Sequence, residues 1–226
     1  MLKVEHITTG YGKKQVLTDV SFSVEKGDVV LLSGGNGSGK STILKTIYGL
    51  LKPWAGEQES KITFEDKKIT ALPVSTMIRY GIVYMPQKKN VFEDFTVEEN
   101  LLVSAGIYSK AEAKERAEKV FEILPLLKEK RKRTPFNMSG GERQQLAFGN
   151  ALVHSPKMFL LDEPFAGVDA ENSEVLRSCI VDLKKGNVTF VIVEHKRQLL
   201  ESVVNKEIEL ELGVIKKTSN NNGVDD

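Results

Sequence analysis

Short runs of apolar residues separated by polar turns fill the first third of the chain, and this pattern predicts strands. Lys3–Thr8 and Val20–Val24 alternate between apolar and polar positions, as expected for strands with one buried face. Val29–Ser33 is apolar up to its last residue, and Lys61–Phe64 suggests a further strand. We therefore expect an antiparallel N-terminal sheet beside a strand that is buried on both faces.

The middle of the chain changes to a helical period. Thr96 with Glu99, and Ser109 with Glu112, each fit a capping box, in which the first side chain caps a helix that begins there. Behind Ser109, apolar residues recur three or four positions apart, at Ala113, Ala117, Val120, Phe121 and Leu124. Core packing explains this stripe completely, so the pattern predicts a helical subdomain at about residues 88–150.

Strands and helices alternate again in the last third. Met158–Leu161 and Val188–Val193 are apolar almost throughout, which is typical of parallel strands buried on both faces, and a helical pattern lies between them at residues 171–185. The fold class is therefore α/β, with a parallel-sheet core, an antiparallel β-subdomain and a helical subdomain. We expect a single domain over residues 1–217. Residues 218–226 have nothing to bury and are expected to form a disordered tail.

Composition is that of an ordinary globular protein. Of the 226 residues 40% are hydrophobic and 28% charged, and the formal net charge of +1 gives no overall field to attract nucleic acid or an anionic membrane. No apolar run approaches the roughly 18 residues of a membrane span, and the N-terminus has no signal-peptide core. We expect a cytoplasmic protein that reaches membranes only through partners. Cys179, the single cysteine, is expected to be packed and unreactive.

Residues Gly34–Thr42 read Gly-Gly-Asn-Gly-Ser-Gly-Lys-Ser-Thr and match the nucleotide-binding P-loop pattern. Its glycines let the backbone turn amide N–H groups toward phosphate oxygens, and the following helix directs its positive end at the same anion. Lys40 adds charge at the β- and γ-phosphates, and the Ser41 hydroxyl can bind Mg²⁺. A chance Gly/Ser turn is the alternative, but the motif follows a buried strand and precedes an apolar helical run. The predicted nucleotide-binding residues are Gly34, Asn36, Gly37, Ser38, Gly39, Lys40, Ser41 and Thr42.

Two acidic residues end the apolar run at Met158–Leu161. Asp162 and Glu163 would lie at the carboxyl edge of the sheet, where open α/β sheets bind their ligands. Asp162 can hold Mg²⁺ as the acid of a Walker B motif. A strand that continued through Glu163 would turn this side chain the other way, toward a water opposite the γ-phosphate. A solvated turn usually explains such a pair, but the P-loop upstream favours the catalytic interpretation.

A second glycine-rich stretch, Ser139-Gly140-Gly141-Glu142, has the pattern of a helix start. Ser139 and Glu142 fit a capping box, and the free amide groups of a helix N-terminus also form an anion site. The local sequence does not indicate which anion would bind there. If these residues are considered without the other motifs, capping is the stronger explanation.

With these motifs in this order, the chain resembles the ATP-binding subunits of ABC transporters over nearly all of residues 1–215. Ser139–Glu142 resembles the signature motif, with Met138 where leucine is usual. Leu160–Pro164 resembles the Walker B motif, and Ala166–Asp169 resembles the D-loop, which contributes Asp169. The resemblance implies a P-loop NTPase core and ATP as the nucleotide.

Three single residues also match positions of this family. Gln87 falls at the Q-loop glutamine, His195 at the switch histidine and Tyr11 at the aromatic residue that stacks on adenine. Each has a simpler alternative: turn packing for Tyr11, a strand-end cap for Gln87 and a satisfied core-edge histidine for His195. The basic run Lys128–Arg133 is best explained as a solvated helix end, because it lacks the interleaved aromatics of a nucleic-acid site.

The resemblance implies a mechanism of phosphoryl transfer to water. Mg²⁺ would be held by Ser41, Asp162 and Gln87, while Glu163 orients or deprotonates the attacking water. His195 would hold the γ-phosphate. Gln87, Glu163 and His195 are therefore the expected catalytic set, which acts by positioning and electrostatics.

The resemblance also implies partners. In the family the signature residues, here Ser139, Gly140, Gly141 and Glu142, belong to the ATP site of the opposite subunit. We therefore expect a head-to-tail dimer, a homodimer or a heterodimer with a paralogous ATPase, that is bound through integral membrane permease subunits to the inner face of the cell membrane. Phe92–Leu101 is similar to ATPases of branched-chain amino-acid importers, whereas Pro164–Asp169 is also similar to lipopolysaccharide-export ATPases.

Two other functional classes stay open. A soluble ABC-type ATPase of translation, repair or cluster assembly often has two cassettes or a long coiled-coil insertion, and this chain has neither. A P-loop kinase would need an acceptor site and would have no use for Ser139–Glu142. Release of the γ-phosphate as free phosphate would separate an ATPase from a kinase.

Overall fold

The computed structural model describes residues 1–56, 58–88 and 90–220, and an antiparallel sheet forms its N-terminal part. The strand order is β2-β1-β4-β5. The strands are β1 (Leu2–Tyr11), β2 (Lys14–Val24), β4 (Lys61–Phe64) and β5 (Lys67–Lys68). A tight hairpin pairs Tyr11 with Lys14, so the end of β1 and the start of β2 lie side by side. The antiparallel sheet expected from the alternating pattern is confirmed.

A second sheet forms the centre of the molecule, with the order β10-β9-β3-β8-β7-β6. Its strands are β3 (Val29–Gly34), β6 (Ile82–Met85), β7 (Met158–Asp162), β8 (Thr189–Val193), β9 (Lys206–Glu211) and β10 (Val214–Asn220). All neighbours from β6 to β9 are parallel, and β10 is antiparallel to β9. Along β3, Val30 and Leu32 enter one core while Val29 and Leu31 enter the other. Because both faces are covered, the strand is apolar from Val29 to Leu32.

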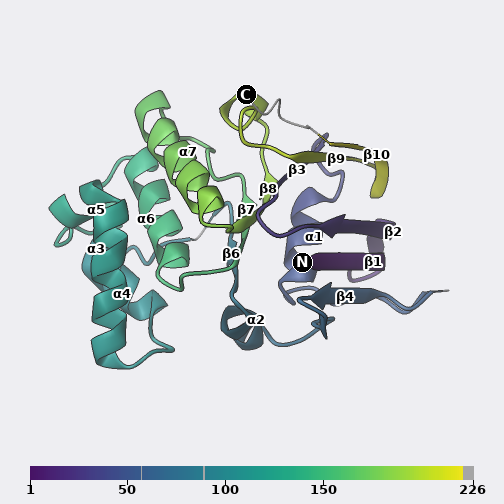
Figure 1. Cartoon of the computed structure of the whole chain (residues 1–226), viewed down its shortest axis with the longest axis horizontal. Coiled ribbons are helices and arrows are strands. Elements are labelled where there is room, and N and C mark those ends of the chain that lie inside the picture. The colour runs from purple at the N-terminus through teal and green to yellow at the C-terminus, as the bar shows by residue number, and fades with distance from the viewer. Residues whose placement is uncertain (57, 89, 221–226) are drawn as a thin grey trace.

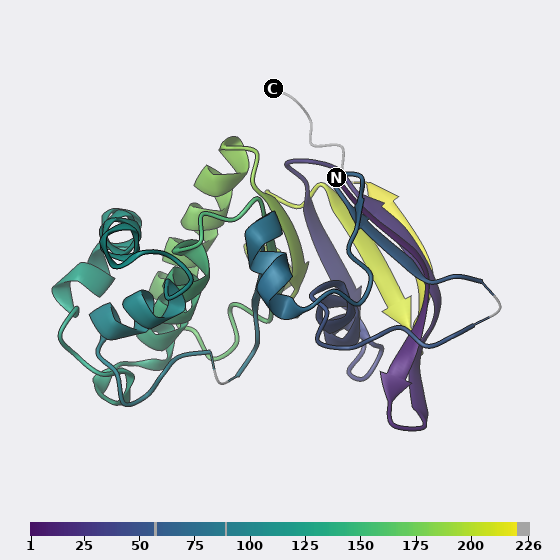
Figure 2. The same cartoon turned by 90° about the horizontal axis from the view of Figure 1, so that it is seen from below.

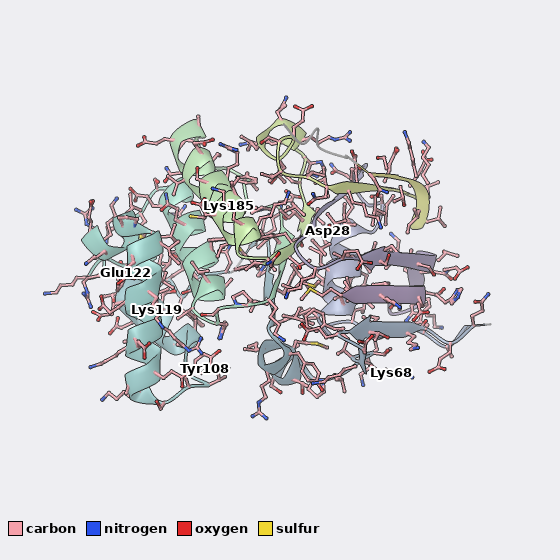
Figure 3. The ribbon with its side chains drawn as sticks, in the orientation of Figure 1. Asp28, Lys68, Tyr108, Lys119, Glu122 and Lys185 are labelled. Atoms are coloured by element: carbon pink, nitrogen blue, oxygen red, sulfur yellow. The ribbon has the colours of Figure 1, made fainter. Side chains whose placement is uncertain are left out.

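Helices cover the two faces of this sheet differently (Figure 1). The helices are α1 (Lys40–Ile47), α2 (Val74–Tyr80), α3 (Val97–Ser104), α4 (Lys110–Ile123), α5 (Pro125–Glu129), α6 (Gly140–Leu152) and α7 (Ala170–Lys185), with 3-10 turns at Pro135–Asn137 and Arg197–Leu199. Figure 2 shows α1 between the two sheets, where its apolar residues join the strands of both in one core. Helices α3 to α6 form a separate lobe, and Figure 3 labels Lys119 and Glu122 on its surface, on α4.

An aromatic stack joins the helical lobe to the parallel sheet. Phe148 of α6 stacks on Phe159 of β7 with ring centroids 5.3 Å apart, and Phe159 stacks on Phe190 of β8 at 5.1 Å. All three side chains are fully buried. Such stacked pairs stabilise beyond their buried area. The stack therefore connects the signature helix to the strand that carries the Walker B residues.

Two of the three predicted capping boxes are complete. Thr96 and Ser139 each accept a hydrogen bond from the backbone three residues on, and Glu99 and Glu142 each return one. Ser109 caps α4, but Glu112 does not complete the box, because its carboxylate accepts from the Arg116 side chain instead. An (i, i+4) ion pair has thus replaced the second capping bond.

The expectation of a disordered tail from residue 218 is wrong for residues 218–220. Thr218, Ser219 and Asn220 continue β10 and pair with the start of β9. The edge of β9 offers backbone hydrogen bonds that a polar segment can satisfy without burying apolar side chains. The rest of the predicted tail, residues 221–226, lies outside the described residues.

The cysteine and the hydrophobic character of the helices were both expectations from composition. Cys179 lies buried on α7, which confirms a packed cysteine, and burial raises the pKa of its thiol to about 11. Among the helices of the described residues, none combines the length and the apolar character needed to cross a membrane.

Replacing Asn100 with alanine is expected to lower the free energy of unfolding by about 2–4 kcal/mol. Asn100 is fully buried, and its amide oxygen accepts from the Phe92 N–H at 2.8 Å. Its amide nitrogen donates to the carbonyl oxygens of Phe92, Phe95 and Thr96 at 2.9–3.0 Å. Urea unfolding measures the loss. Glu93→Ala, an exposed change in the loop that Asn100 holds, should cost less than about 0.5 kcal/mol; equal losses would contradict the prediction.

Candidate functional site

A tight loop joins the end of β3 to the start of α1. Gly34 and Gly39 in this loop have φ angles of 132° and 105°, which other residues rarely adopt. A Cβ at Gly34 would lie 2.1 Å from the carbonyl oxygen of Leu210, and one at Gly39 would lie 2.5 Å from the Leu17 side chain. Both the backbone conformation and the neighbouring atoms therefore require glycine, and the loop has the predicted P-loop geometry.

The loop presents hydrogen-bond donors that suit an anion. Gly39 is the N-cap of α1 and provides no side-chain acceptor for the first amide groups of the helix. The Ser38 hydroxyl is buried and makes no hydrogen bond within the described structure. Lys40 Nζ lies over the loop, 2.8 Å from the carbonyl oxygens of both Gly34 and Gly35. Burial lowers the pKa of Lys40, while Glu163 and Asp162 oppose the shift. These groups fit the phosphates of a nucleotide.

A cavity of about 490 Å³ opens next to this loop. It is lined by Tyr11, Lys14, Gln15, Val16, Asn36, Gly37, Gly39, Lys40, Ser41, Thr42, Glu163, His195 and Leu212. Its volume is in the usual range for small-molecule sites. The Tyr11 side chain, at the end of β1, is 47% exposed and therefore has a free surface on which a base can stack. The structure thus brings Tyr11, the P-loop, Glu163 and His195 to one cavity, as the sequence predicted.

Asp162 is oriented by two hydroxyl groups. Ser41 Oγ donates to its Oδ1 at 2.7 Å, and the Tyr84 hydroxyl donates to its Oδ2 at 3.1 Å. A hydroxyl and a carboxylate side by side, with water completing the shell, are ligands that Mg²⁺ prefers. Ser41 and Asp162 therefore fit a magnesium ion. Gln87, the third predicted ligand, contacts Glu163 instead: its Nε2 donates to Glu163 Oε2.

Glu163 does not continue the strand, so the expected strand geometry is wrong at this residue. β7 ends at Asp162, and Glu163 has a left-handed φ of 52°. Its N–H still donates to the Val193 carbonyl at 2.8 Å, which fixes the turn. The carboxylate then lies 3.4 Å from His195 Nε2 and accepts from Gln87. The turn thus brings the three predicted catalytic residues into contact.

Two groups that support the site were missed from the sequence, the half-buried Tyr84 and the buried Glu194. Tyr84, on β6, orients Asp162, and both burial and that carboxylate raise the pKa of its hydroxyl. Glu194 accepts hydrogen bonds from the N–H groups of His195, Lys196 and Phe165, and so fixes the turns on both sides of the site. Glu194 could have been predicted, because it is an acid that directly precedes His195 at the end of an apolar strand. Tyr84 lies three residues before Gln87, and nothing in the sequence indicated that its hydroxyl would bind Asp162.

The signature residues lie at a different place, where α6 meets the start of α7. Ser139 and Glu142 cap α6, as predicted. A Cβ at Gly141 would lie 2.7 Å from the Asn172 side chain, whose amide also donates to Asp169 Oδ2 at 2.7 Å. Asp169 is the N-cap of α7, so the D-loop and the signature motif contact each other. Among the described residues that line the nucleotide cavity, none belongs to residues 139–142.

The parallel α/β core, the glycine loop and the acid pair at the end of β7 define a P-loop NTPase. The ABC transporter family profile matches residues 17–166. The branched-chain amino-acid transport ATP-binding protein BraG of Pseudomonas aeruginosa is 38% identical over 215 residues, which are 95% of this chain and 91% of BraG. LivF of Archaeoglobus fulgidus, a probable protein of the same kind, is 37% identical over 88% of this chain and 83% of its own length. LptB of Haemophilus influenzae, of a lipopolysaccharide export system, is 32% identical over 86% of this chain and 80% of LptB.

Solved structures agree with this likeness. A nucleotide-free ATP-binding cassette of an ABC transporter superimposes with a TM-score of 0.87 at 31% identity, covering 97% of this chain and 91% of the cassette. A dimeric cassette bound to ADP and phosphate superimposes with a TM-score of 0.86 at 25% identity, covering 99% of this chain and 100% of the cassette. The chain belongs to the ABC transporter family and is an ATP-binding protein with ATPase activity.

Proposed function

We propose that this chain powers an ABC importer of branched-chain amino acids by closing with a second ATPase subunit in the presence of ATP. The observation that supports a dimer is that the P-loop and the signature motif lie apart within one chain. The signature residues, at the start of α6, do not line the nucleotide cavity, so a second subunit must supply that motif to the site. The relatives BraG and LivF support the substrate class. The export ATPase LptB, less similar to the chain, supports lipopolysaccharide or lipid export as the second candidate.

In the proposed site, Tyr11 stacks on adenine and the P-loop binds the phosphates. The amide groups of the loop, the unpaired Ser38 hydroxyl and Lys40 are its donors. Asn36, Gly37, Gly39 and Thr42 also line this part of the cavity. Because these groups are fixed before the nucleotide binds, they stabilise the charge of the phosphates without reorganisation.

The catalytic step proposed is in-line attack of water on the γ-phosphorus, in which the bond to the oxygen between the β- and γ-phosphates breaks and ADP leaves. Glu163 accepts the proton of that water, and its left-handed backbone places the carboxylate beside Gln87 and His195. His195 donates to the γ-phosphate. Ser41 and Asp162 would hold Mg²⁺, which would neutralise negative charge of the phosphates, and Gln87 would add its amide oxygen as a further ligand.

A second copy, or a paralogous ATPase, completes the site. Ser139, Gly140, Gly141 and Glu142 are proposed to contact the γ-phosphate of the partner's ATP from the start of α6. Asp169 lies against this motif through Asn172, so the D-loop can transmit closure between the two sites. Integral membrane permease subunits would hold the dimer at the inner face of the cell membrane. We expect no nucleic-acid partner.

Affinity capture of the tagged Glu163→Gln protein from detergent-solubilised membranes of its own organism tests the proposal, with mass spectrometry of what is retained. Co-purification of a polytopic membrane protein in stoichiometric amount is expected. Binding of radiolabelled leucine by a binding protein of the same complex would support amino-acid import. A complex with lipopolysaccharide-export components would support the second candidate. Retention of soluble partners alone would overturn transport and favour a soluble ABC-type ATPase.

Replacing Tyr84 with phenylalanine should raise the Mg²⁺ concentration for half-maximal ATPase activity by about tenfold. The change removes the hydrogen bond that orients Asp162 Oδ2, while the ring stays packed against Tyr48. The maximal rate at saturating Mg²⁺ should change little, since the reacting groups are intact. A magnesium titration of phosphate release measures the effect. Tyr80→Phe, on α2, is the control; equal shifts in both variants would rule out the proposed role of Tyr84.

A further inference from the structure

A leucine occupies the tight turn between β9 and β10 under two unfavourable conditions. Leu212 is 90% exposed, more than any other large apolar residue of the described chain. It also has a left-handed φ of 48°, where glycine or asparagine is ordinary and a bulky side chain is strained. A leucine at this position neither adds to the buried core nor suits the backbone of the turn. A ligand that covered the side chain would remove its apolar surface from water and would explain why a leucine is found here.

The turn is fixed to the nucleotide-binding loop. The N–H of Gly213 donates to the Ser38 carbonyl of the P-loop at 3.1 Å, and the Gly213 carbonyl accepts from the Thr18 N–H of β2 at 2.9 Å. A Cβ at Gly213 would lie 2.1 Å from the Val16 carbonyl oxygen, so the two backbones are in close contact. Leu212 is therefore held in place relative to both the P-loop and β2.

Leu212 also lines the nucleotide cavity, and the apolar side chains of that lining are Tyr11, Val16 and Leu212. The rest of the lining consists of glycines and polar or charged residues, from the P-loop, the catalytic turn and the start of β2. Val16 contacts the Leu212–Gly213 turn and follows the hairpin that carries Tyr11. The cavity thus has a polar part for phosphates and an apolar part for the other half of a nucleotide.

We propose that Leu212 is a nucleotide-binding residue whose side chain packs on the ribose and base, as an apolar wall in addition to Tyr11. The assignment rests on the proposed ATP site. Covering an exposed leucine with the nucleoside removes apolar surface from water, which favours binding. Because the contact is apolar, it acts on the nucleoside half of ATP and leaves the phosphates to the P-loop.

The test compares ATP with inorganic tripolyphosphate, both with Mg²⁺, by isothermal titration calorimetry on wild-type protein and on Leu212→Asn. Asparagine accepts the left-handed conformation but offers no apolar wall. We expect ATP to bind about three- to tenfold more weakly to the variant, with tripolyphosphate affinity unchanged. The melting temperature should be equal or higher, because the strained leucine is gone.

Val214→Asn is the matched control, since Val214 is an exposed apolar residue of the same hairpin outside the cavity lining. Unchanged ATP affinity of Leu212→Asn would overturn the inference and leave the ATP site in place. Equal weakening of ATP and tripolyphosphate would also overturn it, because the turn would then act only by holding the P-loop. Wild-type protein that bound neither ligand would overturn the proposed function itself.

Discussion

Glu163→Gln is expected to lower ATP turnover by at least about 100-fold while ATP still binds. Glutamine has the shape of glutamate and can keep the contacts to Gln87 and His195, but its amide cannot accept the proton of the attacking water. Lys40, Ser41 and Asp162 are unchanged, so the groups that bind the phosphates and the metal stay in place. Binding and hydrolysis should therefore separate in this variant.

The same variant should accumulate as an ATP-bound dimer, because closure no longer leads to hydrolysis. Steady-state phosphate release measures the turnover, and size-exclusion chromatography with and without Mg²⁺-ATP measures the dimer. Glu171→Gln, an exposed acid in the first turn of α7, is the control and should behave as wild type. Turnover above a few per cent of the wild-type rate would remove Glu163 from the role of base.

The left-handed backbone at Glu163 explains why this residue can serve the site. Positive φ costs free energy for a residue with a side chain, and it persists where surrounding contacts determine the conformation. Here the N–H of Glu163 is bound to Val193, and the buried carboxylate of Glu194 fixes Phe165 and His195. The protein thus stores strain in the turn that brings Glu163 to Gln87 and His195.

The features predicted correctly from the sequence depend on residues close together in the chain. The P-loop glycines, the apolar strand before Asp162 and the capping boxes at Thr96 and Ser139 each depend on a few neighbouring positions. Local chemistry decides such features, because backbone conformation and helix capping are set within one turn. This is why the nucleotide site could be placed before its geometry was known.

The features that were missed join distant segments or depend on weak local signals. The Tyr84–Asp162 bond spans 78 residues, and no short-range pattern pairs them. The left-handed turn at Glu163 breaks the period-2 rule by which its direction was expected. Residues 207–211 do alternate strictly between charged and apolar residues, and this signal could have predicted β9 and a partner for the polar residues of β10.

Mixing two inactive variants should restore ATPase activity if the sites are shared between subunits. Lys40→Ala removes the positive charge that faces the phosphates. Gly141→Ala places a Cβ at the start of α6, only 2.7 Å from the Asn172 side chain of α7. Each variant alone should fall below about 1% of the wild-type rate, because every site contains a defect. In a mixed dimer, the P-loop of the Gly141→Ala chain meets the intact signature of the Lys40→Ala chain, so one site is whole.

An equimolar mixture is expected to recover about a quarter of the wild-type rate, since half of the dimers are mixed and each has one whole site of two. Phosphate release from mixtures prepared before ATP is added measures the recovery. The control combines Lys40→Ala with Glu163→Gln, whose defects lie on the same side of the shared site, so both sites of the mixed dimer stay defective. Recovery in the first mixture alone requires head-to-tail sites in a homodimer. Equal rates in the two mixtures would contradict that arrangement and point to sites within one chain or to a paralogous partner.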